Sequence, residues 1–206
     1  MVSIVLIFLL TALISFAGSL QVGPVNYFVM ETGLRQNKTA AILVAIGGSI
    51  PEFIYSVLAI TIGISLQQTP AFFLAFEWIT IALLIALSIY YFLKKVAQNT
   101  QPRISKKGSF LKGFTLGLLN PQLLPFWLVV YTSFFTSTGL SITSFPQQLA
   151  FILGTGIGAF GLHLCLIYLV QTNKERLEKW MAFPYFNRFL GGFFLLLAFV
   201  QIGSLC

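Results

Sequence analysis

Two short runs rich in glycine, proline and asparagine interrupt apolar stretches of this sequence, at 23–26 and at 120–122. Proline is favoured at the first position of a helix, and glycine or asparagine before it can act as the N-cap. Each run therefore predicts a helix that stops and starts again, at Pro24 and at Pro121, with a partial positive charge at the new start. Such a start inside a membrane can hold an anionic group of a substrate. The residues of the two runs that we expect to bind substrate are Gly23, Pro24, Asn26, Asn120, Pro121 and Gln122.

One acidic residue, Glu52, lies about thirteen residues into another apolar stretch, roughly 20 Å along a helix from its basic end. A carboxylate near the middle of a bilayer is costly, so Glu52 is expected to face the interior of a helix bundle. Burial favours the neutral form of the group, which allows Glu52 to take up and release a proton during a transport cycle. We predict that Glu52 binds substrate and couples transport to protons. The alternative is a structural carboxyl that is satisfied by Ser49, Tyr55 or another helix.

The other polar residues within apolar stretches are more typical of structural roles. Glu31 and Arg35 are four residues apart, which is typical of an ion pair at the membrane interface. Glu77 precedes a tryptophan and is expected near the outer headgroups, where that residue is enriched. His163 and Cys165 point to different faces of a helix, so a hydrogen-bonding or proton-relaying His163 is favoured over a metal site.

The composition is that of a membrane protein, because 57% of the 206 residues are hydrophobic and only 8% are charged. Soluble domains carry roughly 25% charged residues. A helix needs about 20 apolar residues to cross a hydrocarbon core about 30 Å thick, and the uncharged runs provide six such lengths. Turn-rich segments at 67–70 and 136–146 divide the two longest runs. The predicted spans are 4–34 (interrupted), 39–66, 71–93, 110–135, 147–171 and 185–205.

All twelve lysine and arginine residues lie in or directly beside the first, third and fifth connections between these spans. The positive-inside rule predicts that these connections are cytoplasmic, so that both termini of this multi-pass protein lie outside the cytoplasm. The net charge of +7 is therefore interpreted as a topological signal with anionic-lipid contact rather than as a nucleic-acid surface. We expect a protein of the cell inner (plasma) membrane, in contact with the lipid bilayer and with no nucleic-acid partner.

The two interrupted spans begin two halves of three helices each, at about 1–95 and about 108–206. An odd number of spans per half gives the halves opposite orientations, and transporters built as inverted repeats bind substrate between their discontinuous helices. The predicted fold is a single all-α membrane domain over 1–206, with six transmembrane helices in two inverted three-helix repeats and with helices one and four discontinuous. Glycines near the starts of helices two and five are expected to allow close packing, namely Gly47, Gly48, Gly154, Gly156 and Gly158.

Four stretches of the sequence resemble the lysine exporter (LysE-type) translocator family of small bacterial amino-acid exporters. They are Gly23-Pro24-Val25-Asn26, Leu34 to Ala41, Gly48 to Tyr55, and Asn120-Pro121-Gln122 with Pro125-Phe126-Trp127. The family's first signature is more commonly Pro-Gly-Pro-Asn, and its acid in the second helix is often Asp, where this chain has Glu52. The resemblance implies export of amino acids or related metabolites, driven by the proton gradient, by a homodimer.

The residues and the resemblance together predict a secondary transporter that exports amino acids or related small metabolites. The substrate carboxylate would lie at the two helix starts, while Glu52 would hold the ammonium group or exchange it for a proton. No cofactor, resident metal or catalytic residue is expected, so the protein is not predicted to be an enzyme. The main alternative is a cation or metal-ion exporter on the same scaffold, with Glu52 and His163 among its ligands. A membrane-embedded enzyme and a structural role without transport are weaker alternatives.

Overall fold

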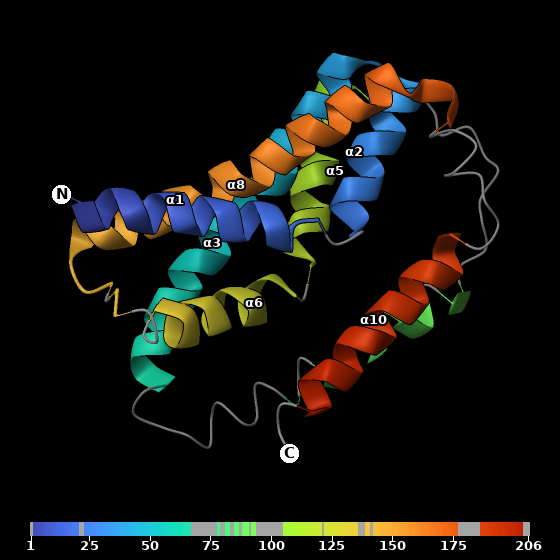
Figure 1. Cartoon of the computed structure of the whole chain (residues 1–206). Helices are drawn as coiled ribbons and strands as arrows, with labels where there is room; N and C mark the ends of the chain where they lie inside the picture. Colours follow the sequence, from blue (N-terminus) through green and yellow to red (C-terminus); the bar gives the residue numbers. More distant parts are fainter. Residues whose placement is uncertain are drawn as a thin grey trace.

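The described part of the chain is entirely helical (Figure 1). The computed structural model describes residues 2–20, 23–66, 105–120, 122–135, 139–140, 142–176 and 186–203, with some residues between 78 and 93. Its elements are α1 (Val2–Gly18), α2 (Pro24–Arg35), α3 (Lys38–Leu66), α5 (Lys106–Leu118), α6 (Leu123–Val129), the π-helix η1 (Val130–Phe134), α8 (Phe145–Thr172) and α10 (Phe186–Gly203).

Two of the described helices, α3 and α8, are long and apolar enough to cross a membrane, with mean hydropathies of 1.8 and 1.9. The helices on either side of the second break bend by 56° and make a third candidate span if they are counted as one. The predicted interruption within 4–34 is confirmed, because α1 and α2 replace a single helix there, and α1 alone is an apolar helix shorter than a candidate span. Helix α10 occupies the last predicted span, whereas the span predicted at 71–93 lies largely outside the described residues.

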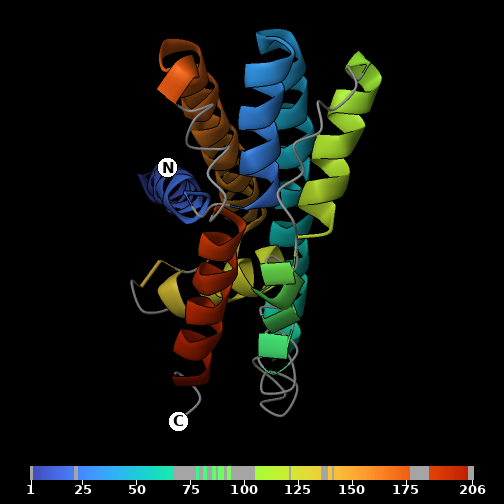
Figure 2. The ribbon, with the colours of Figure 1, turned by 90° about the vertical axis from the view of Figure 1, so that its right-hand side faces the viewer.

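The helices that precede the two breaks each pack closely against a long helix. Helix α1 lies along α8, and α5 lies along α3 (Figures 1 and 2). A Cβ atom on Gly158 would lie 2.2 Å from the carbonyl oxygen of Ala12, and one on Gly113 would lie 2.2 Å from that of Val44. Only glycine permits these approaches of backbone to backbone. The prediction that Gly158 is a close-packing position is confirmed, as it is for Gly47, Gly48, Gly154 and Gly156.

An aromatic cluster forms the core on one side of the molecule. Trp127, Phe135 and Phe151 are among the largest fully buried side chains, and the rings of Trp127 and Phe135 both meet Phe151 edge to face at 5.6 Å. Edge-to-face contacts of this kind fix the relative positions of the rings. The cluster therefore holds α6 and η1 against α8, and so determines where the segment after the second break lies.

The outer faces of α1, α3 and α8 are apolar and exposed. Leu13 is 66% exposed, and Val57 and Ile157 are each nearly half exposed. The charged ends lie elsewhere: the end of α2, the starts of α3 and α5 and the end of α8 gather at one end of the bundle (Figure 2). All four of these helix ends have basic residues at or next to them. An apolar outer surface with one basic end suits a protein that lies in a bilayer.

Candidate functional site

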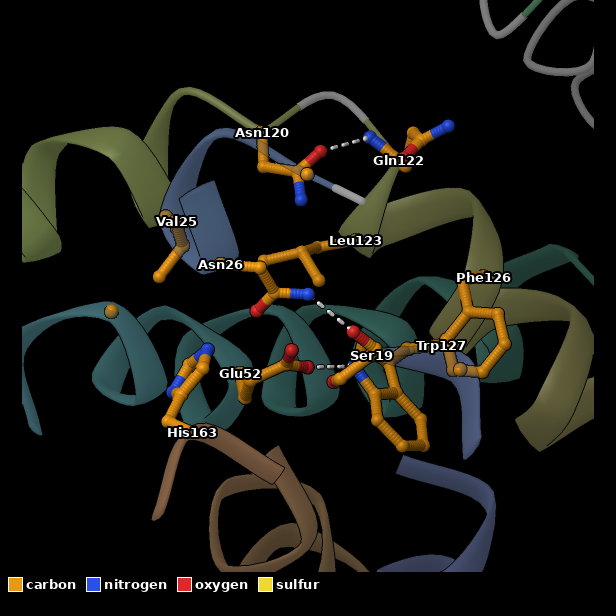
Figure 3. A pocket seen from close by; sticks show the side chains of 14 residues that line it. Ser19, Val25, Asn26, Glu52, Asn120, Gln122, Leu123, Phe126, Trp127 and His163 are labelled. Atoms are coloured by element: carbon orange, nitrogen blue, oxygen red, sulfur yellow. Dashed lines mark hydrogen bonds between the residues drawn. The ribbon is translucent and has the colours of Figure 1, made fainter. Parts of the chain in front are cut away.

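A cavity lies between the two helix breaks and α3 (Figure 3). Its volume is about 60 Å³. Pro24 is not among its lining residues, and Pro121 lies outside the described residues. The predicted binding residues that line it are Gly23, Asn26, Glu52, Asn120 and Gln122. Residues nearly 100 positions apart in the sequence thus share one hollow, which makes this the candidate site.

The first break has the geometry that the sequence predicts. Helix α2 begins at Pro24, and Gly23 before it is in an extended conformation (φ −85°, ψ 170°) and has no side chain to cap the helix. The amides of a first helical turn have no acceptor within their own helix. Asn26 bridges the break, because its Nδ2 group donates a hydrogen bond to the Ser19 carbonyl at 2.6 Å. The start of α2 therefore lies at the cavity, with Gly23, Val25 and Asn26 among the lining residues, and brings the partial positive charge of a helix N-terminus there.

The second break differs from the prediction of a helix start at Pro121. Helix α6 begins at Leu123, two residues later. The reason is the side chain of Asn120, whose Oδ1 accepts a hydrogen bond from the Gln122 amide at 3.2 Å. The Asn120 carbonyl also accepts one from the Leu123 amide at 3.4 Å. Asparagine commonly bonds to the backbone two residues ahead and forms a turn, and here that turn occupies the positions expected to be helical.

Glu52 faces the bundle interior, as predicted, and is only 6% exposed. Its Oε2 atom accepts a hydrogen bond from Nε1 of Trp127 at 2.5 Å. Figure 3 shows its side chain pointing into the space between Asn26 and Trp127. The sequence left open whether Ser49, Tyr55 or another helix satisfies this carboxyl group. The observed partner is on another helix. The Tyr55 hydroxyl instead donates to the Leu118 carbonyl at 2.5 Å.

Trp127 is the residue of the candidate site that the sequence did not predict. It is fully buried, although tryptophan in membrane proteins is enriched near the headgroups. A buried indole N–H needs an acceptor, so a tryptophan soon after a helix break, in the middle of an apolar span, signals a polar partner nearby. The sequence contained that signal in Pro125-Phe126-Trp127, but it did not identify Glu52 as the acceptor.

His163 reaches the cavity from α8 and contacts α3. Its Nδ1 atom lies 3.1 Å from the Ser49 hydroxyl, which donates to the Ala45 carbonyl at 2.8 Å. The tautomer of the imidazole ring decides whether Nδ1 of His163 or the Ser49 hydroxyl is the donor in this contact. The prediction that His163 is a hydrogen bonder facing the bundle is thus confirmed. Within the described residues, no group of three or more His, Cys, Asp or Glu side chains could hold a metal ion.

The other acidic residues of the sequence lie away from the cavity or outside the described part. Glu31 pairs with Arg35 at 3.3 Å, so the predicted ion pair is confirmed. Its setting differs from a solvated interface, because Glu31 is only 7% exposed while the Arg35 side chain is 43% exposed. Helix α2 packs against both α3 and α8, which covers that carboxyl group. Glu77 lies outside the described residues, and Cys165 is exposed with a free thiol.

Comparison with known proteins agrees with the membrane character of the chain. The sequence profile described as "LysE type translocator" matches residues 16–203. The "Putative amino acid efflux protein YcgF" of Bacillus subtilis (strain 168) is 26% identical over 178 residues, which cover 84% of each chain. No solved structure matches the chain. Because the profile covers nearly the whole sequence, the chain belongs to the LysE-type translocator family, whose members are membrane transporters and not enzymes.

Proposed function

We propose that this protein exports amino acids or related small metabolites across the inner membrane in exchange for protons. The observation that carries the proposal is the buried carboxyl of Glu52, which lies in a cavity that also receives the start of α2. An amino acid carries an ammonium group and a carboxylate, and these two features of the site are complementary to them. The match to a translocator family supports the same class of function.

The two ends of the substrate bind to different elements. Glu52 holds the ammonium group, and the first turn of α2, after Gly23 and Pro24, holds the carboxylate through backbone amides. The second break is a weaker place for the carboxylate, because Asn120 already accepts the hydrogen bonds of the first two amides there. Asn120 and Gln122 line the cavity on its other side.

Glu52 couples transport to protons by accepting either of two positive charges. A carboxylate in the membrane interior is stabilised by an ammonium group or is neutralised by a proton, because an unpaired buried charge is costly. Trp127 donates to Glu52 through its indole N–H and can do so in both protonation states, since a neutral carboxyl keeps acceptor oxygens. Proton binding from one side and substrate binding from the other then exclude each other.

The surrounding scaffold consists of two inverted halves, at about 1–95 and about 108–206, within one domain. This part of the proposal is supported by the matching arrangement of α1 on α8 and of α5 on α3, and by the two breaks that follow α1 and α5. The basic ends of four helices gather at one end of the bundle (Figure 2). This common position supports six spans, with the odd-numbered connections in the cytoplasm and both termini outside it. Assembly as a homodimer in the lipid bilayer is part of the same proposal.

Cells fed with dipeptides provide the test, because peptide hydrolysis loads the cytoplasm with amino acids. Cells that express the wild-type chain are expected to hold less of at least one amino acid and to release more of it than cells without it. The Glu52→Gln variant is expected to abolish this difference, since glutamine cannot take up a proton or carry the negative charge that pairs with an ammonium group.

A matched control is Glu175→Gln, because Glu175 is exposed near the end of α8. This variant is expected to export as well as the wild type, and the membrane content of all three proteins is measured by immunoblotting. If no amino acid is exported while the wild-type protein is present in the membrane, the proposal is wrong. Equal export by Glu52→Gln and the wild type would remove Glu52 from the mechanism.

A further inference from the structure

Helices α2 and α5 lie side by side between the basic end of the bundle and the cavity (Figure 1). The start of α2 and the end of α5 both contribute lining residues, among them Asn26 and Gly117. Their other ends, at Arg35 and Lys106, belong to the basic end of the bundle (Figure 2). The line of contact between these two helices, here called the α2–α5 seam, therefore runs from the basic end to the cavity.

The helix contacts on either side of this seam are made by backbone and by apolar side chains. Helix α5 packs directly on α3, because a Cβ atom on Gly47 would lie 2.2 Å from the carbonyl oxygen of Phe110. Helix α2 meets α3 and α8 in a buried apolar cluster that includes Val29, Val44 and Ile167. Opening either contact would separate closely packed helices, which a tightly packed interior resists.

The α2–α5 seam instead contains a long charged side chain. Lys112 lies six residues after the first residue of α5, about 9 Å along the helix axis. Its Nζ atom is 4.0 Å from the centroid of the Phe28 ring on α2, which is a cation–π distance. A lysine side chain has a flexible four-carbon stem, so the ammonium group can leave the Phe28 ring without a shift of either helix.

The balance of charge along the seam is positive. Phe28, Glu31 and Arg35 are spaced by three and four residues, so they share one face of α2. Glu31 is the only acid of α2 and is already paired with Arg35 at 3.3 Å. Lys112 adds a positive charge on the other side of the seam. A positive charge between low-dielectric walls raises the local concentration of anions.

We propose that the α2–α5 seam is the cytoplasmic entrance to the site beside Glu52, and that Lys112 attracts the carboxylate of the substrate into it. The proposal rests on the proposed function, which supplies the carboxylate and places the basic end in the cytoplasm. The carboxylate passes from Lys112 to the first turn of α2, and the ammonium group then reaches Glu52. Lys112 acts during the approach of the substrate, before the substrate is bound.

Thiol chemistry tests the entrance without knowledge of the substrate. Cys165 and Cys206 are replaced by serine, and Leu116→Cys then adds one thiol, four residues beyond Lys112 in the direction of the cavity. Leu116 is partly buried against the apolar cluster of α2 and α3. Inside-out membrane vesicles are treated with an anionic or a cationic methanethiosulfonate, and each rate is divided by the rate of the same reagent with free mercaptoethanol. On this scale the anionic reagent is expected to react at least fivefold faster than the cationic one.

Lys112→Gln is expected to remove this preference, and Lys112→Arg to keep it. Lys107→Gln is the matched control, because Lys107 is an exposed lysine in the first turn of α5. It removes the same charge and is expected to keep the preference. An unchanged preference in Lys112→Gln would overturn the role of Lys112. A Leu116→Cys thiol that reacts in denatured protein but not in the inside-out vesicles would overturn the entrance.

Export gives a second measurement that needs no added cysteine. The release of the amino acid identified by dipeptide feeding is followed against its cytoplasmic concentration. Lys112→Gln is expected to raise the half-saturating concentration at least threefold and to leave the maximal rate per protein unchanged, because the charge acts during the approach. Lys112→Arg is expected to behave as the wild type. A fall in the maximal rate alone would mean a structural role and overturn the proposal for Lys112. If no amino acid is released while the anionic reagent keeps its preference, the proposed function is wrong and the anion entrance stands.

Discussion

At the first break, between α1 and α2, the residue before the new helix is Gly23, which has no side chain to cap the first turn. At the second break, between α5 and α6, Asn120 accepts hydrogen bonds from the amides of Gln122 and Leu123. At the first break no side chain caps the first turn, whereas at the second break the amides of Gln122 and Leu123 are used in the Asn120 turn. Similar sequence signals therefore have different chemical results, because the capping residue decides which amides remain for a ligand.

The segments before the two breaks are alike in packing. Helix α1 meets α8 where Ala12 approaches Gly158, and α5 meets α3 where Val44 approaches Gly113. After the breaks the chain again differs, because α2 continues into the basic end of the molecule whereas α6 carries Trp127 to Glu52. The common packing positions the breaks. The different residues at them make one break the proposed site for the substrate carboxylate and the other a support for the Glu52 carboxyl group.

The largest expected effect tests whether the packing of α1 on α8 and the packing of α5 on α3 are equivalent. In Gly158→Ala and Gly113→Ala, the new Cβ would lie 2.2 Å from a backbone carbonyl oxygen, so the helices must separate. Overpacking costs about 1 to 3 kcal/mol and sometimes more, and we expect both variants to lose most of their folded protein. Size-exclusion chromatography of a fluorescent fusion in detergent measures this loss.

Gly161→Ala is the matched control on α8, because its Cβ would meet Phe16 at an ordinary 3.7 Å. It should elute as the wild type does. If Gly113→Ala loses its folded protein and Gly158→Ala elutes like this control, the packing of α5 on α3 and the packing of α1 on α8 do not have equivalent roles.

The next effect tests the difference between the breaks with the same substitution at each. Asn26→Asp loses the Nδ2 donor to Ser19 and adds a negative charge near the proposed carboxylate site. Asn120→Asp keeps an oxygen that can accept from Gln122, and aspartate is as good a cap as asparagine. We expect export to fall at least about tenfold in Asn26→Asp, which corresponds to about 1.4 kcal/mol. Export by Asn120→Asp should stay close to that of the wild type.

Initial rates of amino-acid release, corrected for the protein in the membrane, measure both variants. Equal losses would mean that the two breaks bind substrate in the same way, as the sequence alone suggested. A loss confined to Asn120→Asp would reverse the assignment of the anion site.

The features that the sequence predicted correctly are those that depend on local chemistry. The Pro24 start, the inward position of Glu52 and the close-packing glycines follow from residue type and depth in the membrane. The later start of α6 is also local, but it depends on a competition between an asparagine turn and a proline start. Propensities do not decide such a competition, because both structures are favoured by the same residues.

The pairings between helices were not predictable from the sequence. Trp127 and Glu52 are 75 residues apart, and Ser49 and His163 are 114 apart. Each pairing depends on the rotation and crossing of two helices, which are set by packing over their whole length. The sequence identified the polar groups at depth and left their partners open.

A smaller effect tests the support that the second break gives to Glu52. Trp127→Phe keeps an aromatic ring against Phe151 but removes the N–H that donates to Glu52. Leaving a buried acceptor unsatisfied costs about 1 to 3 kcal/mol, so we expect a lower thermal midpoint in detergent. Trp78→Phe is the control, because Trp78 is 55% exposed. If both variants melt at the same temperature, α6 does not stabilise Glu52 through this hydrogen bond.

The smallest effect concerns the contact between α3 and α8 beside the cavity. Ser49→Ala removes the hydroxyl that lies 3.1 Å from His163, three residues before Glu52 on α3. Hydrogen bonds between membrane helices contribute about 0.6 kcal/mol on average, so the thermal midpoint should fall only slightly. Export should persist, because neither proposed substrate contact is changed. Glu52→Gln is expected to abolish export. If Ser49→Ala does so as well, the proton path includes His163, and the transport site consists of more than the first break and Glu52.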